Sequence, residues 1–555
     1  MKGYSLLAAI ILTFCVVRGA AQEMHPHTHD HNEKLGQVSF SISCSPASQK
    51  QFNRATALLH SFWYEEAEKS YVAITREDPK CAMAHWGVAM SNYHPVWAPA
   101  NKGELQKGWA AVESAKSSDA KTERERAYIA AIEAFYKDHD KLDHRTRALA
   151  YEKAMEQLHM RYPKDREGAI FYALALLGTG PVTDKTFANQ KKAAALLNRV
   201  LPMEPRHPGV AHYLIHSFDY PQLATYALPA ARRYARIAPS SPHALHMPSH
   251  IFTRLGLWQE SISSNLASAA AAKNHVMKTH PGAASFDELH AVDYLVYAYL
   301  QGAQDEKAAR LLAYLKRVNK LDVEQFAAAY AFGAVPARYA LERRQWAEAA
   351  KLEIHPVNFP WQNFEYAEAL IHFARAIGAA RSGDPSTART AVDKLASLRE
   401  ALANKKSAYW ANQVEIQRQA AAAWLAFSEK NHDDGLKLMR SAADLEAASE
   451  KHPVTPGAVL PARELLGDML LEMKKGDEAL VAYEASLRDA PKRLYALYGA
   501  ARAAQLCGDG KKVASYYAKV VALTSEADTV RPEMREARQF VRRGHGPSAK
   551  AGRNH

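Results

Sequence analysis

Cysteine is scarce in this chain of 555 residues. It occurs only at Cys15, Cys44, Cys81 and Cys507, and Cys15 lies in an N-terminal stretch that we expect to be removed. The three cysteines that would remain cannot form a fully paired disulfide framework. Cys44 and Cys81 can bridge in an oxidising compartment, and a buried free thiol is an equally good interpretation of each. The fold therefore cannot depend on disulfides.

Long apolar runs are lacking after the N-terminus. The chain opens with Lys2, an apolar run over 6–17 and small residues over 19–21, which is typical of a secretory signal peptide cleaved after Ala21. That run is too short to cross a membrane comfortably, and no later segment is apolar enough to do so. We therefore expect a soluble protein outside the cytoplasm, either secreted or, in a Gram-negative bacterium, periplasmic.

Familiar catalytic motifs are lacking as well. The sequence has no Gly-Lys-Ser/Thr phosphate loop, no Gly-x-Ser-x-Gly nucleophile turn and no His-Glu-x-x-His zinc-protease helix. If the chain is an enzyme, we expect it to depend on a metal. The formal charge of +12 lies partly in a C-terminal run from Arg531 to Arg553. A solvated basic tail explains this run better than a nucleic-acid partner does.

What the sequence does have is a histidine pattern that repeats. Two histidine pairs and one proline pair keep an offset of 34 residues: His212 with His246, His216 with His250, and Pro205 with Pro239. Residues four apart share one face of a helix, and packed helices lie roughly 8–10 Å apart. Both pairs can therefore converge on one object, and HALHMPSH adds His243 to the group.

The 34-residue period is that of the tetratricopeptide repeat, a helix-turn-helix unit that stacks into a solenoid. The chain resembles this family most clearly in PARELLGDMLLEMKKGDEALVAYEASLRDAPKR, where Gly467, Ala479, Tyr483 and Pro491 stand at the small, aromatic and proline positions of the repeat. The resemblance covers most of residues 48–525 and is degenerate in the middle. It implies an all-α tetratricopeptide-like α-solenoid of the secreted bacterial type, with the four repeating histidines facing a concave groove.

Composition and repeat pattern divide the chain into six parts. These are a signal peptide over 1–21, a His-rich disordered leader over 22–47, N-terminal repeats with a His-lined groove over 48–273, degenerate helical repeats over 274–450, C-terminal repeats over 451–527 and a basic disordered tail over 528–555. A chain of 555 residues is too long for one compact core. We therefore expect either a repeat array or several domains.

The candidate metal ligands are His212, His216, His246, His250 and His290. His290 follows His250 by 40 residues, so the repeat gains about one helical turn and the side chain is expected to point inward again. Residues expected to support the ligands are His243, Asp293, Glu288, Tyr213, His60 and His94. Neutral imidazole suits zinc, copper, iron and nickel alike, so the ligand type does not choose the metal.

In an enzyme, we expect Asp293 or Glu288 to act as base and Tyr213 or Tyr294 as proton donor to a metal-activated water or dioxygen. Pro248 separates His246 from His250. It is favoured as the first residue of a helix, which leaves His246 in the preceding turn.

Two further segments allow two interpretations each. In the leader, His25, His27, His29 and His31 form either a flexible chelator or an ordinary polar leader. The proline-rich EKHPVTPGAVLP, residues 450–461, is either a rigid connector between repeats or a loop folded back over the groove that presents His452.

Two functions remain for the chain. The first is a secreted binding or scaffold protein that holds a peptide, a partner protein or a glycan-related ligand in its groove, where the histidine cluster binds a transition metal or polar ligand. The alternative is a metal-dependent hydrolase or oxidoreductase with that cluster as its active site.

Overall fold

The computed structural model describes residues 33–96, 99–118 and 120–544. Within these ranges the chain is built from α-helices and contains no strand, only an isolated bridge between Ala284 and Leu321. The all-α prediction is confirmed. The predicted signal peptide, the leader histidines at 25–31 and the last eleven residues, 545–555, lie outside the described residues.

The helices follow one another along the chain with short turns between them. The first are α1 (Pro46–His60), α2 (Tyr64–Glu77), α3 (Ala82–Ser91), α4 (Lys102–Ser117), α5 (Glu123–Tyr136), α6 (His144–Arg161), α7 (Arg166–Thr179) and α8 (Ala188–Val200). The middle ones are α9 (Pro208–Phe218), α10 (Ala224–Ile237), α11 (Pro242–His246), α12 (Pro248–Arg254), α13 (Trp258–Thr279), α14 (Phe286–Gln301) and α15 (Asp305–Leu315). The last are α16 (Phe326–Glu342), α17 (Trp346–Ala349), the 3-10 turn η1 (Trp361–Asn363), α18 (Glu365–Ser382), α19 (Pro385–Asn404), α20 (Ala408–Ser428), α21 (His432–Ala448), α22 (Ala462–Glu472), α23 (Gly476–Asp489), α24 (Leu494–Leu506), α25 (Gly510–Leu523) and α26 (Pro532–Gly544).

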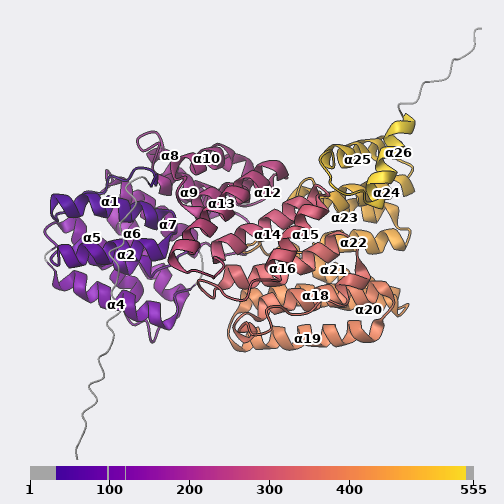
Figure 1. Ribbon diagram of the computed structural model, residues 1–555, viewed down its shortest axis with the longest axis horizontal. Helices are drawn as coiled ribbons and strands as arrows, with labels where there is room; N and C mark the ends of the chain where they lie inside the picture. The colour runs from indigo at the N-terminus through magenta and orange to yellow at the C-terminus, as the bar shows by residue number, and fades with distance from the viewer. Residues whose placement is uncertain (1–32, 97–98, 119, 545–555) are drawn as a thin grey trace, which may run out of the picture. The chain divides into compact units, whose positions relative to one another are not determined.

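Neighbouring helices along the chain pack against each other, and many also contact the helix after next, as α14 does with α16 and α18 with α20 (Figure 1). This is the packing of stacked helix-turn-helix repeats, in which each unit buries its apolar face against the next. One contact is longer in range, because α1 also packs on α9. It places the end of α1 beside the first helix of the histidine pattern.

The small residues of the repeat lie where an aromatic ring needs room. A Cβ added at Gly467 would lie 2.8 Å from the Tyr483 ring, and one at Gly499 would lie 2.2 Å from it. The ring therefore fills the space between α22 and α24. Tyr71 stands against Gly87 in the same way, with 2.3 Å to the added Cβ. The glycine positions of the repeat thus allow an aromatic side chain to pack between neighbouring helices.

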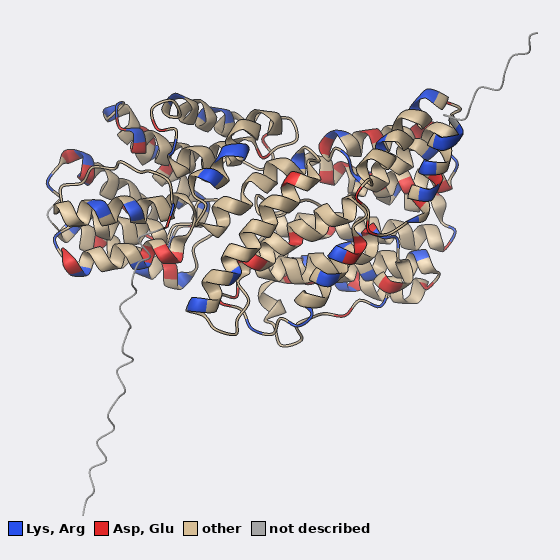
Figure 2. Ribbon diagram, turned by 45° about the horizontal axis from the view of Figure 1, so that its top comes forward, with Lys and Arg blue, Asp and Glu red and all other residues tan. Residues whose placement is uncertain are grey.

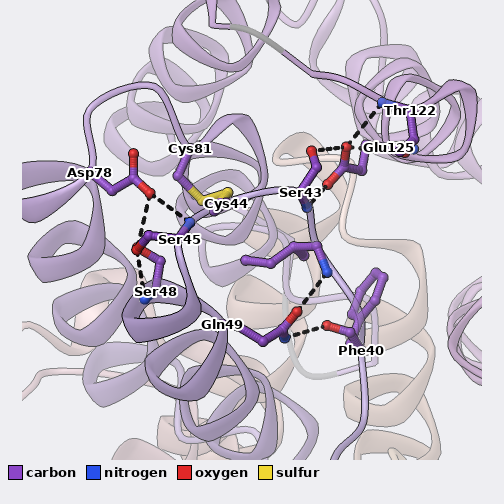
Figure 3. The surroundings of a disulfide bond; sticks show 11 residues. Phe40, Ser43, Cys44, Ser45, Ser48, Gln49, Asp78, Cys81, Thr122 and Glu125 are labelled. Carbon is purple, nitrogen blue, oxygen red and sulfur yellow. Dashed lines mark hydrogen bonds between the residues drawn. A yellow bond between two sulfur atoms is a disulfide. The ribbon is translucent and has the colours of Figure 1, made fainter.

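At the N-terminal end the predicted leader spans 22–47, and over its described part, 33–47, the structure differs from the prediction of disorder. Phe40 is fully buried, and Cys44 forms a disulfide with Cys81. Figure 3 shows this disulfide beside Asp78, whose carboxylate accepts hydrogen bonds from the Ser45 amide at 3.2 Å and the Ser48 hydroxyl at 3.0 Å. The buried Phe40 side chain and the disulfide hold this segment against the helices. Its polar composition had suggested disorder. Cys507 is a free thiol.

At the C-terminal end, part of the predicted tail over 528–555 is a packed helix, α26. The Arg531 guanidinium is buried and donates to Asp305 Oδ2 at 3.0 Å, to the Glu342 carbonyl at 3.1 Å and to the Leu300 carbonyl at 3.0 Å. These hydrogen bonds attach the start of α26 to the preceding helices. The basic composition of the segment did not indicate this contact.

Charged residues of both signs are interleaved along the helices (Figure 2). In the ranges that the structure describes, no helix is long and apolar enough to cross a membrane.

Candidate metal centre

The repeating histidines come together from four consecutive parts of the fold. Helix α9 carries His212 and His216, α11 carries His243 and His246, α12 carries His250, and α14 carries His290. Pro248 is the first residue of α12, as expected, and His246 is the last residue of the short helix α11 instead of lying in a turn. None of these six side chains belongs to a residue more than 8% exposed. The predicted histidine-lined groove is therefore a closed interior cluster, because the neighbouring helices and a loop cover it.

The six imidazoles form two triads. The first triad is His212, His216 and His243, and the second triad is His246, His250 and His290; in each, three ring nitrogens lie within 4.8 Å of one another. The triads adjoin, since the ring centres of His216 and His250 are 6.2 Å apart and those of His243 and His246 are 6.1 Å apart.

In the second triad two nitrogens meet at hydrogen-bond distance. His246 Nε2 lies 3.0 Å from His250 Nε2, and the His290 ring lies 4.2 Å from the His246 ring between centres. The opposite nitrogen of each ring faces an oxygen. His246 Nδ1 lies 2.6 Å from Asn265 Oδ1, and His250 Nδ1 lies 3.0 Å from Asp219 Oδ2.

These oxygens determine where the ring protons are. The Asn265 amide nitrogen donates to the Ser261 carbonyl, so its Oδ1 is the acceptor for His246. The Asp219 carboxylate only accepts. Each Nδ1 therefore carries the hydrogen, and in a neutral ring each Nε2 is left with a lone pair. The two lone pairs of His246 and His250 point at the same place.

The first triad is oriented by the backbone. His212 Nδ1 donates to the His60 carbonyl at 2.7 Å, and His212 Nε2 then lies 3.1 Å from His216 Nε2 and 3.2 Å from His243 Nε2. The contact between α1 and α9 supplies this carbonyl. The Nε2 atoms of His216 and His243 therefore both face His212 Nε2.

Burial keeps these rings in the neutral form that binds metals. It lowers the pKa of His212 to about 3 and holds the pKa of the others below the usual histidine value, most strongly at His216, His243, His246 and His290. The pKa of His250 is lowered as well, although the hydrogen bond to Asp219 opposes the effect of burial.

The Asp219 carboxylate accepts the Nδ1 hydrogen of His250. It also accepts from Lys451 Nζ at 2.8 Å and from Arg254 Nε at 2.9 Å. Burial opposes its ionisation, but these two cations and His250 hold its pKa well below the ordinary range. Burial lowers the pKa of Lys451 to about 8, and Asp219 counters this effect.

The loop of residues 450–461 folds back onto the helices that carry the cluster. The Tyr294 hydroxyl donates to the Val454 carbonyl at 3.1 Å and lies 3.3 Å from His250 Nε2. Further along, Arg338 donates to the Ala458 carbonyl at 2.9 Å. Of the two interpretations of this segment, the folded-back loop is the one observed. Its His452 ring, however, packs on Trp410 at 5.1 Å and does not join either triad.

Two predicted acids on α14 have partners on other elements. Asp293 faces the buried Arg338, with 3.7 Å between Oδ1 and Nε, and burial raises its pKa to about 6. Burial also raises the pKa of Glu288, which forms a hydrogen bond with the Tyr314 hydroxyl. The role of base that the sequence suggested for either acid stays a prediction.

Of the other predicted supporting residues, His60 contacts a triad, whereas the Tyr213 hydroxyl and the His94 ring have partners other than the triad nitrogens. The Tyr213 hydroxyl lies 2.9 Å from His60 Nδ1, so it faces His60 and not the triad nitrogens. His94 packs on the Tyr64 ring at 4.4 Å and lies 4.0 Å from Glu104. His60 supports the first triad, but through its carbonyl instead of its ring.

A third buried cluster was not predicted. Glu167 lies 3.0 Å from His60 Nε2 and 2.9 Å from His207 Nε2. Both histidines oppose the effect of burial and lower the pKa of this carboxyl. Because these nitrogens are already bonded to the carboxylate, the arrangement is a hydrogen-bond network beneath α9. His207 precedes Pro208, the first residue of that helix. This position at a helix start is the only feature of the sequence near His207 that could have drawn attention to the cluster.

Comparisons with known proteins add little. No family model matches the chain, and no curated protein matches it. Among solved structures, the human IFIT1 dimer with m7Gppp-AAAA is 13% identical, covers 80% of this chain and 90% of its own, and has a TM-score of 0.33. A monomeric IFIT1 mutant with Gppp-AAAA is 13% identical, with coverage of 87% and 98% and a TM-score of 0.35. Similarity at this level carries no argument about function.

Proposed function

We propose that this chain is a transition-metal protein whose second triad, His246, His250 and His290, binds a metal ion inside the stacked helices. The observation that carries the proposal is the contact of 3.0 Å between His246 Nε2 and His250 Nε2. Each of these two rings already uses its Nδ1 hydrogen on an oxygen. Two lone pairs at this separation repel each other unless a cation lies between them.

A shared proton is the simplest such cation, but it accounts for only part of the arrangement. One proton joins two nitrogens, whereas the triad presents three within 4.8 Å of one another. A metal ion accepts all three lone pairs and retains a position for a further ligand. Zinc, copper and iron are all compatible with this imidazole set.

The surroundings of the second triad support the proposal. A ligand histidine commonly donates its other N–H to a carboxylate or carbonyl, which fixes the ring and raises its basicity. His250 does so to Asp219, and His246 does so to the Asn265 side chain. Asp219 is itself held by two cations, so its position does not depend on the metal.

Metal-dependent catalysis, by a hydrolase or an oxidoreductase, is the alternative that one observation favours. The Tyr294 hydroxyl lies 3.3 Å from His250 Nε2, and burial raises the pKa of this phenol well above its ordinary value. The raised pKa keeps this phenol protonated, so it can donate a hydrogen bond to a metal-bound group in place of the Val454 carbonyl. This supports Tyr294, of the two predicted tyrosines, as the donor in the enzyme alternative.

The scaffold function rests on a different place in the fold. A hollow of about 870 Å³ between α13 and α23–α25 is lined by Trp258, Leu487, Leu497 and Tyr516, with Lys492 beside them. A peptide or partner segment fits there without touching the buried histidines. Export remains a proposal, and the Cys44–Cys81 disulfide supports it because such bonds persist in oxidising compartments.

Metal content tests the proposal. The parent protein is the full chain with His25, His27, His29 and His31 changed to alanine, so that the leader cannot contribute metal. We expect the double variant His246→Ala/His250→Ala to contain about one equivalent less transition metal than this parent by elemental analysis. Circular dichroism checks that it stays helical.

His94→Ala is the matched control, because His94 is a largely buried histidine outside the triads and its loss should leave the metal content unchanged. A double variant with the same metal content as its parent would refute the proposal.

A further inference from the structure

We propose that the first triad, His212, His216 and His243, is a second metal site, so that the two triads form one dinuclear centre. This inference rests on the proposed function of the second triad and extends it. Three observations support it. The nitrogens of the first triad point at one another, aromatic rings pack around them, and the ring centres of His216 and His243 lie only 6.2 Å and 6.1 Å from those of His250 and His246 in the second triad.

The nitrogens of the first triad are arranged for a cation at their centre. His212 gives its Nδ1 hydrogen to the His60 carbonyl, so its Nε2 has one lone pair. Two other nitrogens, His216 Nε2 and His243 Nε2, approach that atom at 3.1 Å and 3.2 Å. One lone pair in the plane of the ring cannot accept two hydrogen bonds of full strength. A metal ion between the rings receives a lone pair from each of them.

Aromatic rings hold the triad in place. The Phe62 ring centre lies 4.3 Å from that of His212 and 5.6 Å from those of His216 and His243. The Phe62 backbone has φ of 54°, in the left-handed region that a bulky side chain rarely adopts. The Tyr234 ring also stacks on that of His212, with 5.2 Å between ring centres and 17° between the ring planes. Ligands packed in this way are preorganised, which favours metal binding.

The two triads differ in the charge beside them. In the second triad His250 bonds to the Asp219 carboxylate, whereas in the first His212 bonds only to a neutral carbonyl. A carboxylate behind a ligand histidine strengthens metal binding by about 10–100-fold. An ion already held in the second triad also repels a second cation through the low-dielectric interior. We therefore expect the second triad to fill first and the first triad to bind more weakly.

The test is a titration of the metal-free full chain with cobalt(II), followed by its visible absorption, in the parent that lacks the four leader histidines. We expect two equivalents to bind, with the second at least about ten-fold weaker. His243→Ala should remove only the weaker step, and His290→Ala should remove the tighter one. His216→Ala provides a second variant of the first triad, in case His243→Ala does not fold.

The outcomes separate the two claims. Saturation at one equivalent, lost in His290→Ala and unchanged in both His243→Ala and His216→Ala, would overturn the second site and leave the proposed function intact. Absence of any bound cobalt(II) in the parent, repeated with zinc(II) and copper(I), would overturn both.

Discussion

Replacing Asp219 with alanine is expected to weaken metal binding by about 10–100-fold and to lower the free energy of unfolding by about 3–5 kcal/mol. The change removes the acceptor of the His250 Nδ1 hydrogen. It also leaves two buried cations, Lys451 and Arg254, without the carboxylate that both contact. Competition with a chromogenic chelator measures the affinity, and urea unfolding of the metal-free protein measures the stability.

Glu450→Gln is the matched control for this prediction. Glu450 lies next to Lys451 in the loop of residues 450–461 and pairs with Lys185 at 2.6 Å, but the Lys185 side chain is 40% exposed. A pair of this kind contributes at most about 1 kcal/mol. We therefore expect Glu450→Gln to change both measurements little. If Asp219→Ala behaves like Glu450→Gln, the carboxylate neither anchors the loop nor supports the ligand.

Arg493→Met is expected to lower the free energy of unfolding by about 3–5 kcal/mol. The Arg493 side chain is fully buried. It lies 2.7 Å from Glu342 and 2.8 Å from Glu464, and it donates to the Tyr297 hydroxyl at 2.9 Å. These contacts tie the start of α24 to α14, α16 and α22. Methionine fills a similar volume but leaves the buried carboxylates without their main partner.

Arg502→Met is the comparison for this variant. Arg502 pairs with Glu536 at 3.3 Å, and the two side chains are 46% and 38% exposed. Solvent screens such a pair, so its loss should cost at most about 1 kcal/mol in the same urea experiment. Equal stability of the two variants would show that the Arg493 network does not hold the C-terminal helices together.

The spacing of the histidines in the sequence predicted that they lie close together, but not that they divide into two triads or that His243 belongs to one of them. An offset of 34 residues places His212 above His246 and His216 above His250 in stacked helices, and one added turn returns His290 to the same place. Small residues and prolines of the repeat likewise predicted the all-α fold. Local periodicity carries this information because each helix packs mainly on its neighbours.

What the spacing could not supply were contacts between distant parts of the chain. Lys451 reaches Asp219 across 232 residues, and the His60 carbonyl reaches His212 across 152. The repeat period does not relate these positions, so the sequence pattern could not predict the contacts. For Asp293 the spacing predicted the position but not the partner. Asp293 lies one turn from His290, yet its carboxylate faces Arg338, because a buried guanidinium requires a carboxylate.

The most direct test of the central claim is X-ray absorption at the edge of the bound metal. The sample is the full chain lacking the four leader histidines and carrying His243→Ala, so that the first triad does not take up the metal, loaded with one equivalent of zinc. We expect about three imidazole nitrogens at about 2.0–2.1 Å, and loss of imidazole scattering when His246→Ala/His250→Ala is added to this chain. A shell of oxygens without imidazole scattering, or a spectrum that this variant leaves unchanged, would contradict metal binding by the second triad.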